Sequence, residues 1–409
     1  MKVLKNIKQL VTLQNAAKKD GRNLRPADLS LIEDAAVAID NDEIKWVGKS
    51  KELPWEYSSV QTLDCSKLII VPEIVDSHTH LVFGGNRAFE YSMRLNGASY
   101  EEIAAAGGGI LATMKNTVLE NEQTLFDKAV ERIERIRSYG VGTIEIKSGY
   151  ALEYRKEKEI SEIIQKLKER YAGKVQIFNT YLAAHAVSQD YSSSNAYLQE
   201  VVIPLMEELN KNKIIDAVDI FHEQGYFDEN DVKTLFNKAS QLGLPLKSHA
   251  DEFNDNGGAA LACDYQALSC DHLLKTSKAG VKKLANSSTV ATLLPGTAFF
   301  LGKELANAKV FLDNGCKVAL ASDYNPGSCH CDNLLLLAAL AGKNLHMNTA
   351  QLWSSITLNA AAALGLNNQG SIESGKKARF SFFQCESVDE IFYSWGRNFA
   401  LTPEQVFDQ

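Results

Sequence analysis

The stretch Val75-Asp76-Ser77-His78-Thr79-His80 joins a short apolar run to two histidines that are separated by one residue. In an extended segment, residues i and i+2 project to the same side, so His78 and His80 can face one point while Thr79 points away. An apolar run that ends in polar residues recurs seven more times along the chain. These further segments span residues 142–150, 177–186, 218–223, 245–252, 268–273, 289–296 and 318–323.

Amphipathic helical patterns separate several of these strand candidates. Eight strand candidates that alternate with helices predict an α/β fold of the (β/α)8 barrel type. A doubly wound open sheet also alternates strands and helices, but it normally has fewer strands and one ligand crevice. Polar residues at the ends of most strands favour the barrel. Apolar residues at helical spacing occupy positions 125, 129, 133 and 136, positions 160, 163, 164 and 167, and positions 232, 235, 236 and 239.

The two ends of the chain have a different character from the middle. Residues 37–39, 44–47, 68–71 and 378–383 are apolar or alternating, which indicates short strands. We therefore expect both termini to meet in one small β-sandwich domain. The expected division is residues 1–70 and 366–409 for this domain and residues 71–365 for the barrel.

Composition restricts the class of protein. The chain has 409 residues, of which 45% are hydrophobic and 23% charged, so it is neither largely disordered nor collagen-like. Its 43 basic and 51 acidic residues give a net charge of −8, which argues against nucleic acid or an anionic membrane as the main partner. The sequence contains neither an apolar run of about 18 residues nor a signal-peptide core, so a cytoplasmic location is expected.

The cysteines agree with a reducing compartment. There are seven, an odd number, with no spacing typical of a disulfide framework. Cys329-His330-Cys331 is the one local cluster that resembles a metal-binding motif. Such closely spaced pairs are usually only neighbours in the chain, so we expect no metal there.

Histidines are concentrated at the ends of the strand candidates. His185, His249 and His272 close later strands, and Asp323 closes the last. Because the strands of a barrel converge, these side chains should share one mouth with the first histidine pair. A third histidine and a carboxylate would complete a metal site with an open position for water, and His249 and Asp323 are the natural candidates. An ion held in this way lowers the pKa of its water towards about 7, which indicates hydrolysis and not hydride or electron transfer.

Seven stretches carry further motifs, among them FGGNR, KSGY, AHA and HADE. They span residues 75–87, 106–110, 145–150, 183–186, 247–252, 270–273 and 321–328. With these motifs the sequence resembles, over nearly its whole length, the imidazolonepropionases, a family of the amidohydrolase superfamily that acts in histidine degradation. The H-x-H pair alone is typical of many metal hydrolases, whereas the combination is specific. One departure is Glu73, where the family usually has glycine after proline, in a turn outside the expected site.

The resemblance implies a (β/α)8 barrel with a small β domain and one zinc or iron ion per chain. The implied ligands are His78, His80, His249 and Asp323, a set that suits both metals. The implied reaction is the hydrolytic opening of 4-imidazolone-5-propanoate to N-formimidoyl-L-glutamate.

Further residues acquire roles from the same resemblance. The propanoate of the substrate calls for a cation, and Arg87 offers a planar fork from the first loop at the barrel mouth. The other implied contacts are Tyr150 to the ring or carboxylate, His185 as a donor to the substrate carbonyl, Glu252 as a proton carrier, His272 to orient the attacking water, and Asn325, Gly327 and Ser328 at the carboxylate end. Glu252, His272 or Asp323 would be the first to accept a proton.

Several alternatives remain at this point. A binuclear site would need a lysine at the end of the fourth strand, and residues 217–223 contain none, so we expect one ion. Lys147, in the second strand, should instead pair with Glu145 or another polar group inside the barrel. Residues 107–109, which are all glycine, are candidates for a hinge or lid.

Two other functions remain possible. Another cyclic-amide hydrolase or a deaminase of the superfamily is the second hypothesis, and a catalytically inactive scaffold is the third. A homodimer is the usual state in the superfamily.

Overall fold

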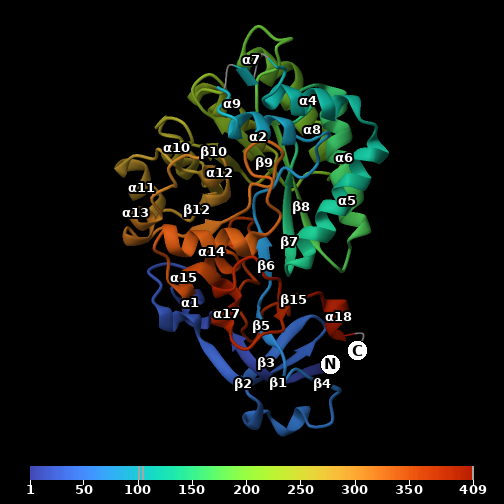
Figure 1. The fold of residues 1–409 in the computed structure, drawn as a ribbon, viewed down its shortest axis with the longest axis vertical. Coiled ribbons are helices and arrows are strands. Elements are labelled where there is room, and N and C mark those ends of the chain that lie inside the picture. Colours follow the sequence, from blue (N-terminus) through green and yellow to red (C-terminus); the bar gives the residue numbers. More distant parts are fainter. Residues whose placement is uncertain (100–101, 104–105, 408–409) are drawn as a thin grey trace.

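The middle of the chain forms a parallel barrel in the computed structural model, which describes residues 1–99, 102–103 and 106–407 (Figure 1). Within these residues eight strands follow one another in sequence order, each hydrogen-bonded to the next. A parallel bridge between Thr79 and Tyr324 joins the first segment to the last. The predicted (β/α)8 barrel is confirmed. Its strands are β6 (Ile74–Asp76), β7 (Val141–Lys147), β8 (Gln176–Ala184), β9 (Ala217–His222), β10 (Lys247–Ala250), β11 (Ser269–His272), β12 (Val290–Leu293) and β13 (Val318–Leu320).

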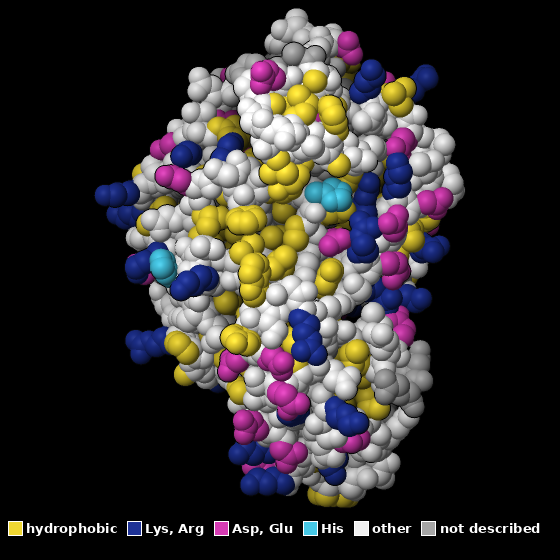
Figure 2. Space-filling view, viewed as in Figure 1, with side chains coloured by type: hydrophobic (Ala, Val, Ile, Leu, Met, Phe, Trp, Pro, Cys, Tyr) yellow, Lys and Arg dark blue, Asp and Glu magenta, His cyan; other side chains and the backbone are white. Residues whose placement is uncertain are grey.

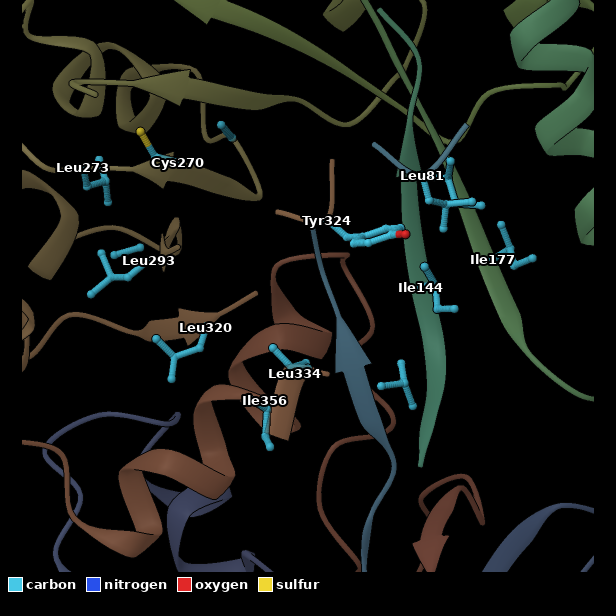
Figure 3. Close-up of a cluster of buried hydrophobic side chains, with 14 of the residues drawn as sticks. Leu81, Ile144, Ile177, Cys270, Leu273, Leu293, Leu320, Tyr324, Leu334 and Ile356 are labelled. Atoms are coloured by element: carbon cyan, nitrogen blue, oxygen red, sulfur yellow. The ribbon is translucent and has the colours of Figure 1, made fainter. Parts of the chain in front are cut away.

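Helices cover the outside of the barrel. The three amphipathic patterns form α5 (Glu122–Ser138), α6 (Tyr154–Arg170) and α9 (Glu229–Gln241), and their periodic apolar residues are buried. Figure 3 shows part of the core between strands and helices, to which β12 contributes Leu293 and β13 contributes Leu320. The other helices of this region are α2 (Ala88–Leu95), α4 (Ile110–Leu119), α7 (Ser194–Tyr197), α8 (Ile203–Lys211), α10 (Gly258–Asp264), α11 (Lys278–Ala285), α12 (Pro295–Phe300), α13 (Ala308–Asp313), α14 (Leu334–Asn344), α15 (Thr349–Ser355) and α16 (Leu358–Ala362).

Both ends of the chain meet in a second sheet, which lies below the barrel in Figure 1. The N-terminal strand β1 (Lys2–Val11) pairs with β2 (Leu31–Asp40), and the C-terminal strand β14 (Phe380–Phe383) pairs with β5 (Ile69–Pro72). The predicted β structure formed by both chain ends is confirmed, and within the described chain it is one continuous sheet of seven strands. We propose that the domain boundaries lie near residues 70 and 366. The other strands and α-helices described here are β3 (Glu43–Lys49), β4 (Thr62–Asp64), β15 (Ala400–Leu401), α1 (Gln14–Lys18), α17 (Val388–Tyr393) and α18 (Pro403–Phe407), and three short 3-10 helices span Pro26–Leu29, Ser50–Glu52 and Trp55–Tyr57.

Glu73, the residue that departs from the family pattern, joins the two sheets. Its buried Oε1 accepts hydrogen bonds from Thr143 Oγ1 at 2.6 Å and from Arg379 Nε at 2.8 Å. Thr143 belongs to β7 and Arg379 immediately precedes β14, so this ion pair fastens the terminal sheet to the barrel. The contact lies at the amino ends of the barrel strands, on the side away from the strand ends that carry the histidines.

The outer surface carries mixed charges. On the face shown in Figure 2, basic and acidic side chains are interspersed, and hydrophobic side chains gather across its centre. Among the helices of the described residues, none is both long enough and apolar enough to cross a bilayer.

Candidate active site

A cavity of about 440 Å³ opens at the carboxyl ends of the barrel strands. Of the site residues expected from the sequence, all but His78 line this cavity, and His78 is fully buried beside it. Residues far apart in the chain are thus brought to one place by the convergence of the strands. The expected residues in the cavity wall are His80, Arg87, Tyr150, His185, His249, Glu252, His272, Asp323, Asn325, Gly327 and Ser328.

Four ligand-type atoms meet at the floor of the cavity. His80 Nε2 lies 3.2 Å from His78 Nε2 and 3.4 Å from His249 Nε2. Asp323 Oδ1 lies 3.5 Å from the Nε2 atoms of both His78 and His80. Four donors held about 2.0–2.1 Å from one zinc ion at tetrahedral angles are about 3.3 Å apart. The four separations given are close to this spacing. The group in which all ligand atoms of the described residues lie within 4.8 Å of one another consists of His78, His80 and His249, and Asp323 adjoins it on the side of His78 and His80.

The protonation of the histidines agrees with this fit. His78 Nδ1 lies 2.7 Å from Asp271 Oδ2, and His249 Nδ1 lies 3.0 Å from Asp219 Oδ2. Burial holds the pKa of His78 well below its usual value, so the ring is neutral and its one proton faces the carboxylate. His78 then presents the lone pair of its Nε2 to the buried site, an arrangement that a cation would stabilise.

Two buried lysines complete the barrel interior beneath this site. Lys147 Nζ lies 2.9 Å from Glu145 Oε2 and 2.7 Å from Asp219 Oδ2, so the pairing expected for Lys147 is present. Lys247 Nζ lies 3.0 Å from Glu145 Oε2. His78, Glu145 and Asp271 form a second group with metal-ligand spacing. Lys147 Nζ and Lys247 Nζ also lie 3.7 Å and 4.0 Å from Asp271 Oδ2, so a metal ion in this second group would face two ammonium groups.

Two residues of the cavity wall, His272 and Asp323, have a strained backbone conformation. His272 has φ +79° and Asp323 has φ +50°, a left-handed conformation that residues other than glycine adopt rarely and mostly at functional sites. The hydroxyl of Thr297 in α12 donates to Asp323 Oδ2 at 2.5 Å, so the other carboxylate oxygen remains directed at the histidines. Burial raises the pKa of Asp323 to about 6.

Glu252 and His272 form a pair above the four donors. Glu252 Oε2 lies 3.5 Å from His272 Nδ1. Burial, with the nearby charge of Asp323 as a smaller cause, raises the pKa of Glu252 to about 8, so at neutral pH this carboxyl holds a proton. Burial also holds the pKa of His272 well below its usual value. The pair therefore couples a protonated acid to a neutral base at one wall of the cavity.

His185 and Tyr150 form another part of the wall. The rings of His80 and His185 are stacked with centroids 5.0 Å apart, and Tyr150 lies edge-on to His185 at 5.5 Å. Burial lowers the pKa of His185 to about 3, and its Nδ1 lies 3.3 Å from the carbonyl oxygen of Gly149. The neutral ring therefore donates from Nδ1 and keeps Nε2 as an acceptor. This tautomer differs from the donor role expected for His185.

The loop after β13 is organised by Asn325. Its Nδ2 donates to the carbonyl oxygen of Asp323 at 2.6 Å and to Ser328 Oγ at 2.8 Å. Its Oδ1 accepts the backbone N–H groups of Gly327 and Ser328, each at 2.8 Å. The N–H groups of Gly327 and Ser328, two residues expected at the carboxylate end of the substrate, are thus already bound to Asn325. The loop that Asn325 organises in this way lies beside Arg87.

Sequence reasoning assigned no role to several residues that shape the site. Asp219 and Asp271 hold two of the histidines, and Thr297 holds Asp323. A signal was available for the two aspartates, because each interrupts an apolar strand and a buried carboxylate needs partners. His222, by contrast, ends β9 but is not part of the cavity lining, and Cys329-His330-Cys331 is not among the groups with metal-ligand spacing in the described chain.

Comparisons with known proteins agree with this geometry. The sequence model of the amidohydrolase family matches residues 69–402. Imidazolonepropionase from Bacillus velezensis is 37% identical, with 97% of this chain and 93% of the relative covered. The corresponding protein from Agrobacterium fabrum is 41% identical, with 92% and 90% covered, and that from Bdellovibrio bacteriovorus is 38% identical, with 96% and 93% covered.

More distant solved structures share the fold. An atrazine chlorohydrolase variant from Arthrobacter aurescens, in complex with zinc and atraton, has a TM-score of 0.69 at 15% identity, with 95% of this chain and 88% of that chain covered. Guanine deaminase from C. acetobutylicum has a TM-score of 0.67 at 16% identity, with 93% and 90% covered. These two structures show the fold alone, whereas membership of a family is shown by the relatives that are 37–41% identical. By its sequence over nearly its full length and by the family model that matches it, this chain belongs to the imidazolonepropionase family of amidohydrolases.

Proposed function

We propose that this protein hydrolyses 4-imidazolone-5-propanoate to N-formimidoyl-L-glutamate with the help of one zinc or iron ion. The observation that carries the proposal is the meeting of three imidazole Nε2 atoms and Asp323 Oδ1 at the floor of a cavity that Arg87 also lines. In the overall reaction, water adds its oxygen to the ring carbonyl carbon, the adjacent ring C–N bond breaks, and a proton is transferred to the leaving nitrogen.

His78, His80, His249 and Asp323 are the residues that would hold the ion, and His3Asp suits zinc and iron alike. When bound, such an ion activates water for attack and polarises a carbonyl oxygen. The absence of a lysine from β9, together with the lysines that neutralise the second carboxylate group, supports one ion per chain.

The wall residues supply proton transfer and orientation. His272 and Asp323 can accept the proton that the attacking water loses. Glu252, protonated at neutral pH because its pKa is raised to about 8, can deliver a proton to the leaving ring nitrogen. The free Nε2 of His185 can accept a ring N–H, and the hydroxyl of Tyr150 can hydrogen-bond the ring or the carboxylate.

The carboxylate end of the substrate would bind at Arg87. Its guanidinium reaches across the mouth to the loop that carries Asn325, Gly327 and Ser328. Ser328 Oγ accepts from Asn325 and lies 3.5 Å from Asp323 Oδ2, and its hydroxyl can turn to a substrate carboxylate instead. Asn325 and Gly327 shape the loop. A neutral nucleobase has no group for this clamp, so a deaminase function is not favoured.

Arg87→Lys should raise KM and lower kcat/KM by about 10–100-fold, because lysine keeps the charge but loses the planar fork. Steady-state kinetics with 4-imidazolone-5-propanoate measures this effect. Arg155→Lys, at an exposed position of α6, is the matched control and should leave the kinetics unchanged. Wild-type kinetics in Arg87→Lys would remove Arg87 from the substrate site.

Asp219→Asn should weaken metal retention by about 10–100-fold, because the negative charge that orients and polarises His249 is lost. The rate at which a chelator withdraws zinc from the purified protein measures this effect without any substrate. Asp231→Asn, which alters a buried carboxylate at the start of α9, controls for general loosening of the barrel. Equal retention in Asp219→Asn and the wild type would show that Asp219 does not support the ion.

Purified protein given 4-imidazolone-5-propanoate should consume it, and ultraviolet absorbance of the ring follows the loss. A catalytically inactive scaffold would leave the compound unchanged, although the convergence of all four donor residues speaks against that alternative.

We also propose that the protein is located in the cytoplasm, which is supported by its seven free cysteines. A homodimer, the usual state in the superfamily, remains a proposal that sedimentation can test.

A further inference from the structure

The guanidinium of Arg87 is bound by the carboxylate of Glu90, a residue that has no role in the function proposed above. Glu90 Oε2 accepts from Arg87 Nε at 2.8 Å and from Arg87 Nη2 at 2.6 Å. The two side chains are 12% and 9% exposed, so this is a largely buried pair at the edge of the cavity. Both residues lie at the start of α2, one turn apart, and Glu90 itself does not line the cavity.

The contact with Glu90 leaves one particular edge of the guanidinium available. An arginine side chain has five N–H donors in a rigid plane. Glu90 takes the edge formed by Nε and one hydrogen of Nη2. The end of the fork, formed by Nη1 and the other hydrogen of Nη2, remains for a carboxylate. Glu90 thus determines which donors of Arg87 face the cavity.

Two glycines make room for this arrangement. A Cβ atom at Gly327 would overlap Arg87 Nη1, so only glycine lets the guanidinium lie against the loop after β13. A Cβ atom at Gly108 would lie 2.9 Å from Cδ of Glu90, so the glycine-rich segment closes over the carboxylate from the other side. The guanidinium is therefore confined between the Glu90 carboxylate and the Gly327 backbone.

The positive potential of the cavity does not depend on this pair alone. Arg94 and Lys303 also line it, and Lys303 Nζ lies 4.5 Å from the ring centroid of Phe253. These cations could attract an anionic substrate even if the orientation of Arg87 were not fixed. The contact with Glu90 adds a fixed orientation of the guanidinium, because a bidentate pair with a carboxylate requires a defined plane and a defined edge of that group.

We propose that Glu90 is a positioning residue that fixes the orientation of the Arg87 guanidinium for recognition of the substrate carboxylate. Gly327, which has no side chain, leaves the space that the guanidinium occupies on the opposite side. This proposal rests on the proposed function, because it takes the propanoate as the group that Arg87 binds. Glu90 acts through Arg87 and makes no contact of its own with the reacting atoms.

Kinetics of Glu90→Ala and Glu90→Gln test the proposal with two substrates, 4-imidazolone-5-propanoate and its neutral propanamide. For the carboxylate substrate, Glu90→Ala should raise KM by roughly 10–100-fold with kcat little changed, because the fork is no longer oriented. Glu90→Gln keeps an oxygen acceptor and should lose only about threefold. For the propanamide, the KM of Glu90→Ala should equal that of the wild type, because no carboxylate is bound.

Gly327→Ala provides an independent variant. The added methyl group meets the flexible end of Arg87, so the fold should tolerate it while the guanidinium is displaced and KM for the carboxylate substrate rises. Glu131→Gln, which alters an exposed Glu–Arg pair on α5, is the matched control for loss of such a pair. Equal losses on both substrates in Glu90→Ala, or unchanged KM in both Glu90→Ala and Gly327→Ala, would overturn the proposal. Failure of the wild type to consume the carboxylate substrate would instead overturn the proposed function.

Discussion

His249→Ala is expected to lose the metal ion and the activity together. His249 supplies one of the four converging atoms, and its Nε2 lies 3.4 Å from that of His80. Three remaining donors would leave His78, His80 and Asp323 with an incomplete site, so the ion should be released on purification. Because the ion activates the water and stabilises the developing charge, we expect activity to fall by at least about 10³-fold. Elemental analysis and turnover, measured on the same sample, check both parts.

His222→Ala is the matched control for this variant. His222 is also a buried histidine at the end of a barrel strand, but it is not part of the cavity lining. Its replacement should leave metal content and turnover near those of the wild type. If His249→Ala kept a full complement of metal, His249 would not be a ligand, and the four-donor site would be wrong.

Glu252→Gln is expected to lower kcat by at least about 100-fold while metal content stays near that of the wild type. Glutamine keeps the shape of the side chain but cannot exchange a proton with the leaving nitrogen. Glu252 does not supply any of the four converging atoms, and its Oε2 lies 3.5 Å from Nδ1 of the neutral His272. Single-turnover kinetics separates the chemical step from product release, and elemental analysis gives the metal content.

Two outcomes would contradict this role of Glu252. Loss of metal in Glu252→Gln would make Glu252 a ligand and would reopen the assignment of Asp323. Full activity would leave proton transfer to Asp323, His272 or His185. Glu229→Gln, at an exposed position in the first turn of α9, controls for the removal of a carboxylate as such.

Much of the fold could be predicted because the barrel repeats one pattern eight times. All eight strand candidates overlap a strand of the barrel, since each buried strand is a short apolar run between helices. The strand β1 was not predicted, although it is the longest partner of β2. Its register shifts between Leu4 and Ile7, and Asn6 has φ +57°, so a bulge interrupts the alternation by which a strand is recognised.

The site was predictable to the extent that strand ends converge. The histidine pair and His249 come together because each closes a strand of the same barrel. Residues that hold another site residue in place, without closing a strand at the cavity themselves, were not predictable in this way. Asp219 and Glu90 support a neighbour through contacts that depend on side-chain direction and on the packing of α2, and neither is visible in spacing along the chain. The tautomer of His185 likewise depends on one backbone carbonyl, that of Gly149.

A metal titration with product identification tests the central proposal most directly. Metal-depleted protein would be loaded stepwise with zinc or iron, and turnover of 4-imidazolone-5-propanoate would be measured at each step. We expect the rate to rise in proportion to bound metal and to level off at about one ion per chain, with N-formimidoyl-L-glutamate as the product. A plateau at about two ions per chain, or fully loaded protein that leaves the substrate unchanged, would contradict it.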